Sequence, residues 1–324
     1  MRWAAGVLVC ALTAVFSFGP ALALEGPNAA GPIGGTDIHS GQLPPPGVYG
    51  GALGYVSEAT DFKGPDGETL SAFREADLEK QYFSPFLMYV PEWKLFGGSV
   101  GVLGFLPMGN QCGHFQIGEA ENCSAGLGDP YVEVDWSYSF GHYRPSKDPD
   151  AYPVFEGLSV LFGFGITFPY GSYDDDTRQD QILSASLNVW DFSPSVGITY
   201  GTKPIFLEGT EFSAKLFWNN YLKNPSSRYA TGDLLNVDFA ITERWGRFQF
   251  GLAGYYAWQI EDDTWDGFVL PAHGWQLESL GLGPIVNYDM PEYDASVKVK
   301  SFFTAHEVNA IEAWYVVLGW SQKF

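Results

Sequence analysis

Alternation of apolar and polar side chains constrains this chain more than any other feature, and it is clearest between residues 233 and 260. Odd positions carry apolar side chains from Leu235 to Ile241 and again at Trp245, and even positions carry polar or small ones. After a short link the pattern resumes from Phe248 to Ile260 with its parity reversed. A period of two is that of a β-strand with one apolar and one polar face. The segment therefore predicts a β-hairpin, whose long arms with aromatic residues near their ends suit tilted strands that cross a bilayer.

The first residues predict export. Arg2 precedes an apolar run over residues 3–18, and Ala21-Leu22-Ala23 is a small-x-small cleavage site. This order is typical of a signal peptide over residues 1–23. A transmembrane anchor is the alternative, but the run is short for one.

The composition agrees with membrane-spanning strands. Aromatic residues make up 17% of the sequence, the mean hydropathy is near zero, and no later run reaches the ~18 apolar residues of a spanning helix. Alternating strands average to such a hydropathy because lipid-facing and lumen-facing residues cancel. The net charge of -21 and the lack of a basic stripe argue against a nucleic-acid partner.

Similar alternation recurs along the chain. The expected strands cover residues 48–60, 81–92, 95–107, 131–140, 158–168, 181–200, 210–221, 235–245, 248–260, 275–288, 294–306 and 311–324. Segment 181–200 contains Pro194 and can be read as one interrupted strand or as two. One strand gives twelve in total, and an even count places both termini on the periplasmic side. We therefore predict an all-β fold, a transmembrane antiparallel β-barrel of about 12 strands over residues 48–324, with 14 strands as the alternative.

Residues 24–47 form a Gly/Pro-rich leader that ends in Leu43-Pro44-Pro45-Pro46-Gly47. Proline lacks the amide donor that a ladder strand needs. The leader is either a disordered periplasmic segment or a plug inside the lumen, and the plug is the preferred interpretation.

Two cysteines remain outside the signal segment. Cys112 and Cys123 lie in a Gly-rich polar stretch between two expected strands, which predicts a loop disulfide in an exported protein. Two free thiols are the alternative. A metal site with His114 would have an incomplete ligand set, so no metal is expected.

The polar faces of the expected strands would line the lumen. The candidate lining residues are Glu133, Asp135, Lys215, Asn219, Asn236, Asp238, Arg244, Gln249, Gln259, Glu278, Lys298, Lys300 and His306. Both signs of charge occur, which favours an ion-pair network or a transverse field over a selective ring of one charge. Alternatively these side chains only fill and pair inside a narrow barrel, because twelve strands lie between small filled barrels and open porins.

Catalysis is not indicated. The five histidines are scattered, and the Gly-x-Ser-x-Gly run over residues 97–101 falls inside the expected strand 95–107 rather than at a strand-to-helix turn. The best fragment of a catalytic triad is His306 with Glu307 and Glu312, at a loop edge. We expect neither an enzyme nor a cofactor.

The last strand ends on an aromatic residue. Trp320 and Phe324 share the apolar face of residues 311–324. A terminal aromatic of this kind resembles the assembly signal of bacterial outer-membrane barrels, although Gln322 departs from that pattern. The resemblance implies recognition by the barrel assembly machinery and a location in the outer membrane of a Gram-negative bacterium, among lipid and lipopolysaccharide.

Several motifs are spread over nearly the whole mature chain. They are Leu43-Pro44-Pro45-Pro46-Gly47-Val48-Tyr49, Val189-Trp190-Asp191-Phe192-Ser193-Pro194, Arg228-Tyr229 with Gly232-Asp233, Gly251-Leu252-Ala253-Gly254-Tyr255-Tyr256 through Asp262-Asp263, and Leu280-Gly281-Leu282-Gly283-Pro284. Together they resemble the meta-pathway of phenol degradation family. The resemblance implies an outer-membrane channel encoded among genes for aromatic breakdown, similar to the fatty-acid and toluene channels. The identity of the ligand is assigned only by analogy with this family, because one fold can serve many ligands.

These observations predict a passive channel for small hydrophobic or aromatic compounds. A structural or surface-interaction barrel without an open pore is the main alternative, and an outer-membrane hydrolase is a third. The predicted ligand is a small hydrophobic molecule captured at the outer loops.

Overall fold

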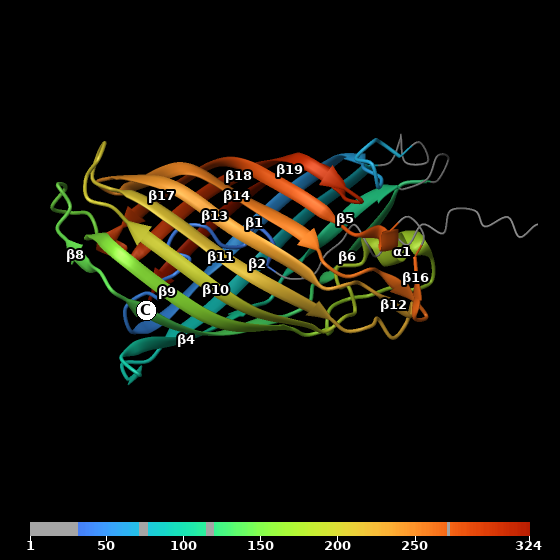
Figure 1. Cartoon of the computed structure of the whole chain (residues 1–324), viewed down its shortest axis with the longest axis horizontal. Helices are drawn as coiled ribbons and strands as arrows, with labels where there is room; N and C mark the ends of the chain where they lie inside the picture. Colours follow the sequence, from blue (N-terminus) through green and yellow to red (C-terminus); the bar gives the residue numbers. More distant parts are fainter. Residues whose placement is uncertain (1–31, 71–76, 115–119, 271–272) are drawn as a thin grey trace, which may run out of the picture.

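The computed structural model describes residues 32–70, 77–114, 120–270 and 273–324. The predicted signal peptide, residues 1–23, and the leader up to residue 31 lie outside the described residues. These described residues form a closed transmembrane antiparallel β-barrel of 12 strands (Figure 1). The predicted fold class and strand count are confirmed, and the alternative of 14 strands is wrong.

Most wall strands are continuous. They are β1 (Gly47–Phe62), β2 (Asp77–Val90), β9 (Val154–Thr167), β10 (Asp191–Gly201), β11 (Thr210–Tyr221), β13 (Leu234–Trp245), β14 (Phe248–Gln259), β17 (Glu278–Met290), β18 (Ala295–Val308) and β19 (Ile311–Lys323). The barrel closes between its first and last strands, where Tyr49 pairs with Lys323 and Phe62 with Ile311.

Two wall positions are each built from two strands in line. β4 (Gly98–Phe105) continues as β5 (Met108–His114), and β6 (Asn122–Leu127) continues as β7 (Tyr131–Ser139). Each interruption contains a proline, Pro107 in the first and Pro130 in the second. Because proline cannot donate to a ladder, these residues interrupt the strands without ending the wall.

The short elements lie at the two ends of the barrel. The terminal end is the one where Gly47 and Lys323 lie, and it carries β3 (Lys94–Leu95), β8 (His142–Arg144) and the 3-10 turn η3 (Pro291–Tyr293). The opposite loop end carries helix α1 (Arg178–Leu183), β12 (Tyr229–Ala230), β15 (Thr264–Trp265), β16 (Phe268–Val269) and η2 (His273–Trp275). Within the described ranges, no helix combines the length and the apolar character needed to cross a membrane.

The β13–β14 hairpin has the predicted form. Trp245 pairs with Phe248 across the turn, and Leu234 pairs with Gln259 at the far end. Outward positions carry large exposed apolar side chains here and on neighbouring strands, among them Val196, Ile198, Phe212, Trp218, Ile241, Trp245 and Leu252. A continuous apolar belt of this kind suits lipid rather than water.

The expected long strand over 181–200 is right in number and wrong in extent. Only β10, which begins at Asp191, belongs to the wall, and α1 occupies residues 178–183. Thr177 caps this helix, because its side-chain oxygen accepts a hydrogen bond from the Asp180 amide. Ile182 and Leu183 are buried against the loop end of the barrel, so tertiary packing selects a helix where alternation suggested a strand.

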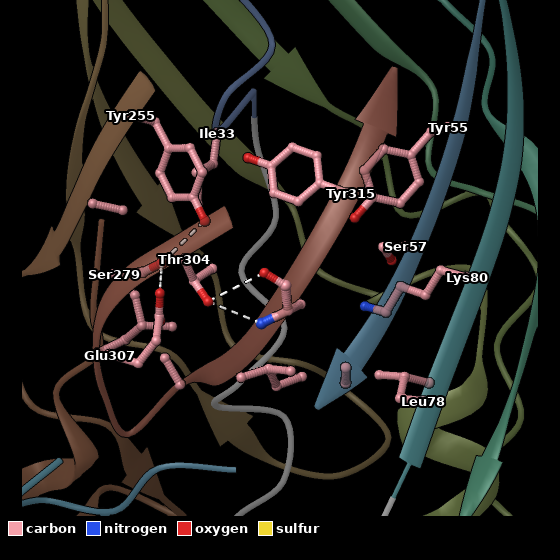
Figure 2. Close-up of a pocket in the computed structure, with 16 residues that line it drawn as sticks. Ile33, Tyr55, Ser57, Leu78, Lys80, Tyr255, Ser279, Thr304, Glu307 and Tyr315 are labelled. Atoms are coloured by element: carbon pink, nitrogen blue, oxygen red, sulfur yellow. Dashed lines mark hydrogen bonds between the residues drawn. The ribbon is translucent and has the colours of Figure 1, made fainter. Parts of the chain in front are cut away.

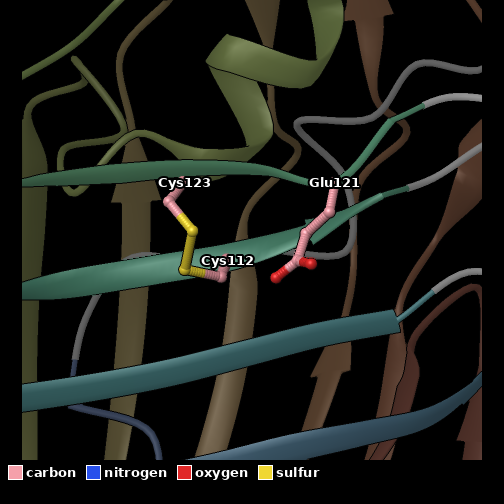
Figure 3. A group of neighbouring side chains, drawn as sticks. All are labelled: Cys112, Glu121 and Cys123. Atoms are coloured by element: carbon pink, nitrogen blue, oxygen red, sulfur yellow. A yellow bond between two sulfur atoms is a disulfide. The ribbon is translucent and has the colours of Figure 1, made fainter.

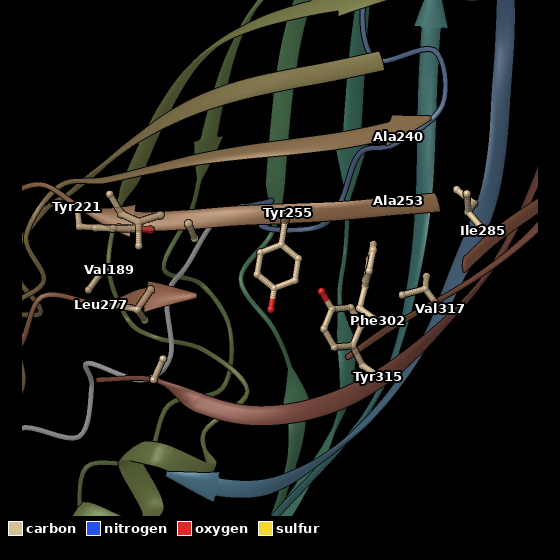
Figure 4. Packing of buried hydrophobic residues seen from close by; sticks show 13 residues of the cluster. Val189, Tyr221, Ala240, Ala253, Tyr255, Leu277, Ile285, Phe302, Tyr315 and Val317 are labelled. Carbon is tan, nitrogen blue, oxygen red and sulfur yellow. The ribbon is translucent and has the colours of Figure 1, made fainter. Parts of the chain in front are cut away.

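The buried core lies inside the barrel. Tyr255, Phe302 and Tyr315 point toward one another from β14, β18 and β19 (Figure 4), and Ile33 and Ile38 of the N-terminal segment pack against their cluster. The lumen is therefore filled at its middle by aromatic side chains and by residues that precede β1.

Candidate functional site: a lumen divided by residues 32–46

Residues 32–46, here called the inner segment, run inside the barrel before β1 begins. Their hydrogen-bond partners come from strands on several sides of the wall, including β7, β9, β10, β11, β13 and β18. Sequence reasoning favoured a plug for residues 24–47, and the part of it that the structure describes lies in the lumen.

Asp37 is the most heavily paired residue of the inner segment. Its carboxylate lies 2.6 Å from Lys298 Nζ and 2.8 Å from Lys300 Nζ, and the Asp37 side chain is 1% exposed. Burial by itself raises the pKa of Asp37, but the charges and hydrogen bonds of the two ammonium groups outweigh it and hold that pKa well below its ordinary value. The acid is therefore ionised and locks this segment to β18.

A second anchor comes from β13. Asp238 accepts hydrogen bonds from the Gly34 amide at 2.8 Å and from the Thr36 amide at 2.9 Å. The Thr36 hydroxyl donates to the same carboxylate, and Lys300 Nζ donates to the Gly34 carbonyl oxygen. The buried backbone of the inner segment thus finds the partners that a strand ladder would otherwise supply.

The inner segment is also held toward the terminal end. The imidazole Nδ1 of His39 lies 2.7 Å from a Glu211 carboxylate oxygen, and the His39 amide donates to the other oxygen. The Gly41 amide donates to Thr199 Oγ1, and Ser137 Oγ donates to the Gly41 carbonyl oxygen. Burial lowers the pKa of His39, but the charge and hydrogen bonds of Glu211 raise it above its ordinary value overall.

Further polar contacts run along the inner face of the wall, from β7 through β11 to β13, beside the inner segment. Lys215 Nζ lies 2.8 Å from Glu133 and 3.3 Å from Asp135, and all three side chains are nearly fully buried. Asn219 donates to Asn236, which donates to Asp238. Acids that would be costly in the core of a sandwich are thus paired on the inner face of the barrel.

Gly34 lies directly against the aromatic cluster. Its φ of +66° lies in the left-handed region, and a Cβ there would come within 2.9 Å of the Tyr315 hydroxyl. Glycine meets both demands because it has no side chain. The inner segment can therefore approach Tyr255 and Tyr315 closely.

Two cavities lie on opposite sides of these anchors. The loop-end cavity has a volume of about 150 Å³ and is bounded by Ile33, by tyrosines of the wall and by polar residues that include Lys80 and Glu307 (Figure 2). The terminal-end cavity has a volume of about 800 Å³. Its mainly apolar lining includes Leu43, Tyr49, Phe86, Met88, Tyr143 and Phe155, and His39, Glu211 and Arg244 also line it.

Most of the predicted lining residues are buried in the lumen. Glu133, Asp135, Lys215, Asn219, Asn236, Asp238, Arg244, Gln249, Gln259 and Lys300 are buried, and Lys298 is partly so. Arg244 lies 2.5 Å from Asp289, and Gln259 donates to the Glu261 carbonyl oxygen. These residues form the ion-pair and hydrogen-bond network that the mixture of charges suggested.

Glu278 and His306 lie on the outer face, contrary to the prediction. Glu278 accepts a hydrogen bond from outward-facing Tyr256, and His306 is paired with Leu280. A β-bulge between Leu280 and Gly281 shifts the register of β18, so His306 no longer shares the face of Lys298 and Lys300. Glu307 consequently turns inward, and His306 and Glu307 point to opposite sides of the wall. The triad fragment is therefore not assembled.

The cysteines are disulfide-bonded as predicted, but not in a loop. Cys112 on β5 and Cys123 on β6 form a directly opposed cross-strand pair (Figure 3). Glu121 lies beside them. The two sulfur atoms bond each other, so they are not available as thiolate ligands for a metal.

Sequence reasoning missed the residues that hold the inner segment and shape the loop-end cavity. Asp37 left no pattern of its own, but the inward pair of lysines on β18 required a buried counter-charge. Tyr255 shares the parity of Gln249 and Gln259, and this parity already placed it on the inward face.

Residues 63–316 match the family described as "Putative MetA-pathway of phenol degradation". The chain belongs to this family. The match covers more than three quarters of the sequence, and it includes every wall strand except β1 and the end of β19. The family resemblance inferred from the motifs is confirmed.

The barrel is similar to the crystal structure of the COG4313 outer membrane channel from Pseudomonas putida F1, with a TM-score of 0.71 and 13% identity over 89% of this chain and 98% of that chain. At this identity the likeness shows the fold. The Pseudomonas putida toluene transporter TodX matches with a TM-score of 0.37 and 11% identity over 87% of this chain and 90% of that chain, which supports no inference. A search among curated proteins gave no match.

Proposed function

We propose that this family member is a passive channel of the outer membrane of a Gram-negative bacterium and conducts small aromatic or other hydrophobic compounds. In the outer membrane, the terminal end of the barrel would face the periplasm and the loop end would face the cell exterior, as is usual for barrels of this membrane. Its surroundings would be lipid and lipopolysaccharide, and Trp320 and Phe324 would present the signal to the barrel assembly machinery.

The mainly apolar terminal-end cavity carries the proposal. With a volume of about 800 Å³ it exceeds the space of a single aromatic ring several times over. Its walls combine Leu43, Phe86, Met88 and Phe155 with polar groups such as Glu211 and Arg244, and the lining surface is mainly apolar. Apolar lining with a few convergent polar groups is the usual character of a site for small hydrophobic molecules.

Transport requires the inner segment to move. The inner segment lies between the two cavities and is held to the wall by the ion pairs of Asp37 with Lys298 and of His39 with Glu211. A compound that reaches the loop-end cavity would pass toward the terminal end when these anchors open. No energy source is invoked, because the concentration gradient would drive net flow.

The test is uptake of a radiolabelled panel by cells with and without the gene. The panel contains phenol, toluene, a long-chain fatty acid and a sugar. Faster uptake of the apolar members only in cells that carry the gene would support the proposal. Equal uptake in both strains would refute it.

A closed structural barrel is the second candidate, and the many anchors of the inner segment favour it. Such a barrel would leave uptake of every compound unchanged. It would instead be needed for envelope integrity, so deletion of the gene would increase sensitivity to detergents without altering uptake rates.

A further inference from the structure

We propose that the loop-end cavity is a binding site for a single aromatic ring that bears a hydroxyl group, with the hydroxyl held by Glu307 and the ring held by tyrosines of the wall. This inference rests on the proposed function and specifies which compounds the channel selects.

The size of the cavity limits the ligand to one ring. Its volume is about 150 Å³. An enclosed apolar cavity of about 150 Å³ in a protein is enough to hold benzene. A fused ring system or a long acyl chain would require the neighbouring side chains to move.

Aromatic side chains form much of the wall. Tyr55, Tyr255 and Tyr315 all line the cavity, and their rings lie in a row along one side of it, from three different strands (Figure 2). The centroid of Tyr315 lies 5.5 Å from that of Tyr55 and 6.1 Å from that of Tyr255. Tilted and stacked pairs at these distances are favourable, and a ligand ring inserted beside them would extend the same packing.

The inner segment closes one side of the cavity. Ile33 contributes to its lining and packs against the cluster that contains Tyr255 and Tyr315. On the loop-end side, Ile182 and Leu183 of α1 pack with Leu78, which also lines the cavity. A bound ring would therefore contact protein on both sides.

Glu307 supplies the polar group that distinguishes one ring from another. The residue is 6% exposed, and its Oε1 accepts a hydrogen bond from Ser279 Oγ at 3.0 Å. Its Oε2 is buried and has no hydrogen-bond partner among the described residues. Buried carboxyl oxygens normally have such a partner, so a ligand that provides one gains affinity.

A ring hydroxyl matches this oxygen in either protonation state of Glu307. It donates a hydrogen bond to the carboxylate, and it accepts one from the carboxylic acid. A hydrocarbon ring of similar size can do neither and leaves Oε2 unpaired. Since an unpaired buried group costs about 1–3 kcal/mol, the hydroxylated ring should bind roughly tenfold to a hundredfold more tightly.

The experiment compares phenol and toluene binding to the purified full chain in detergent, by titration calorimetry or ligand-detected NMR. The wild-type protein should prefer phenol roughly tenfold or more. In Glu307→Leu, phenol affinity should fall to that of toluene while toluene affinity stays within about twofold of wild type. Glu278→Leu is the matched control, because Glu278 is one residue from Ser279 but faces outward, and it should keep the preference.

A measurement on the wild-type protein covers the case in which Glu307→Leu does not fold. Intermolecular NOEs from the phenol ring should reach Tyr55, Tyr315 and Ile33. NOEs only to Phe86 and Met88 of the terminal-end cavity would overturn the assignment. Equal affinity of the wild type for phenol and toluene would also overturn it, as would an unchanged preference in a folded Glu307→Leu protein.

Failure of this inference is distinguishable from failure of the channel. Gene-dependent uptake of phenol and toluene at equal rates, with equal affinities, would refute the hydroxyl site and leave the channel intact. A lack of gene-dependent uptake with a measurable phenol preference in binding would refute the channel and leave the site.

Discussion

Replacing Asp37 with alanine should release the inner segment from the wall. The carboxylate of Asp37 is 2.6 Å from Lys298 Nζ and 2.8 Å from Lys300 Nζ, and its removal leaves Lys300, at 2% side-chain exposure, without this counter-charge. Removing one partner of a buried ion pair typically costs about 3–5 kcal/mol. The pair with Lys298 adds little, because that side chain is 28% exposed and its charge is partly screened by solvent.

The lost stabilisation should favour undocking of the inner segment from the wall rather than unfolding of the barrel. A loss of about 3–5 kcal/mol changes an opening equilibrium roughly 10²- to 4 × 10³-fold. Amide hydrogen exchange reports that equilibrium directly. In Asp37→Ala, the amides of Gly34, Thr36 and Gly41, which donate to wall side chains, should exchange faster by this factor.

Two comparisons make the result decisive. Asp175→Ala removes an exposed acid of the loop end and should leave these exchange rates unchanged. The amides of β13 and β14 should keep their protection in both variants. Unchanged exchange at Gly34 and Thr36 in Asp37→Ala would refute the argument that this ion pair locks the segment.

Three further changes test other contacts of the structure. Glu211 raises the pKa of His39 when the inner segment is docked, so the His39–Glu211 pair stabilises docking fully below about pH 6.5 and is lost as the pH rises through the raised pKa. Exchange of the His39 amide, corrected for its intrinsic rate, should therefore accelerate at alkaline pH in the wild type. It should not do so in His39→Gln. Gly34→Val should make the inner segment accessible to added protease, because a β-branched residue at φ +66° is strained and its side chain would collide with the aromatic cluster. Protection from protease equal to that of the wild type would contradict this prediction. Cys112→Ser should make the β5–β6 hairpin sensitive to protease, because a disulfide across a short loop typically stabilises the folded state by about 2–4 kcal/mol. The barrel itself should keep its heat-resistant migration on gels. A hairpin as resistant as in the wild type would show that the disulfide does not stabilise it.

The sequence predicts the wall well because alternation is a local property. The hairpin of β13 and β14 follows from the parity of Leu235 and Phe248 alone, and the even strand count follows from where both termini must lie. The same parity rule identifies most buried lumen residues. It fails at His306, because a bulge inserts one residue into β18 and reverses the faces beyond it.

The features that could not be predicted from the sequence depend on contacts between residues far apart in the chain. Asp37 meets Lys298 and Lys300 across more than 260 positions, so no local pattern links them. The helix at residues 178–183 forms because Ile182 and Leu183 find a buried place at the loop end. The cysteines were expected in a loop because their glycine-rich surroundings suggest turns, whereas pairing with β2 extends them into the wall. The loop-end cavity likewise depends on three tyrosines from separate strands.

Photolabelling of the lumen tests the central claim most directly. A single-ring aromatic compound that carries a diazirine is added to outer-membrane vesicles containing the full chain, and labelled peptides are mapped after irradiation. If aromatic compounds pass through the barrel, labels should appear on Tyr55 or Tyr315 at the loop-end cavity and on Phe86 or Tyr143 at the terminal-end cavity, and excess unlabelled toluene should suppress them. Labels confined to lipid-facing residues such as Leu252 would contradict the account.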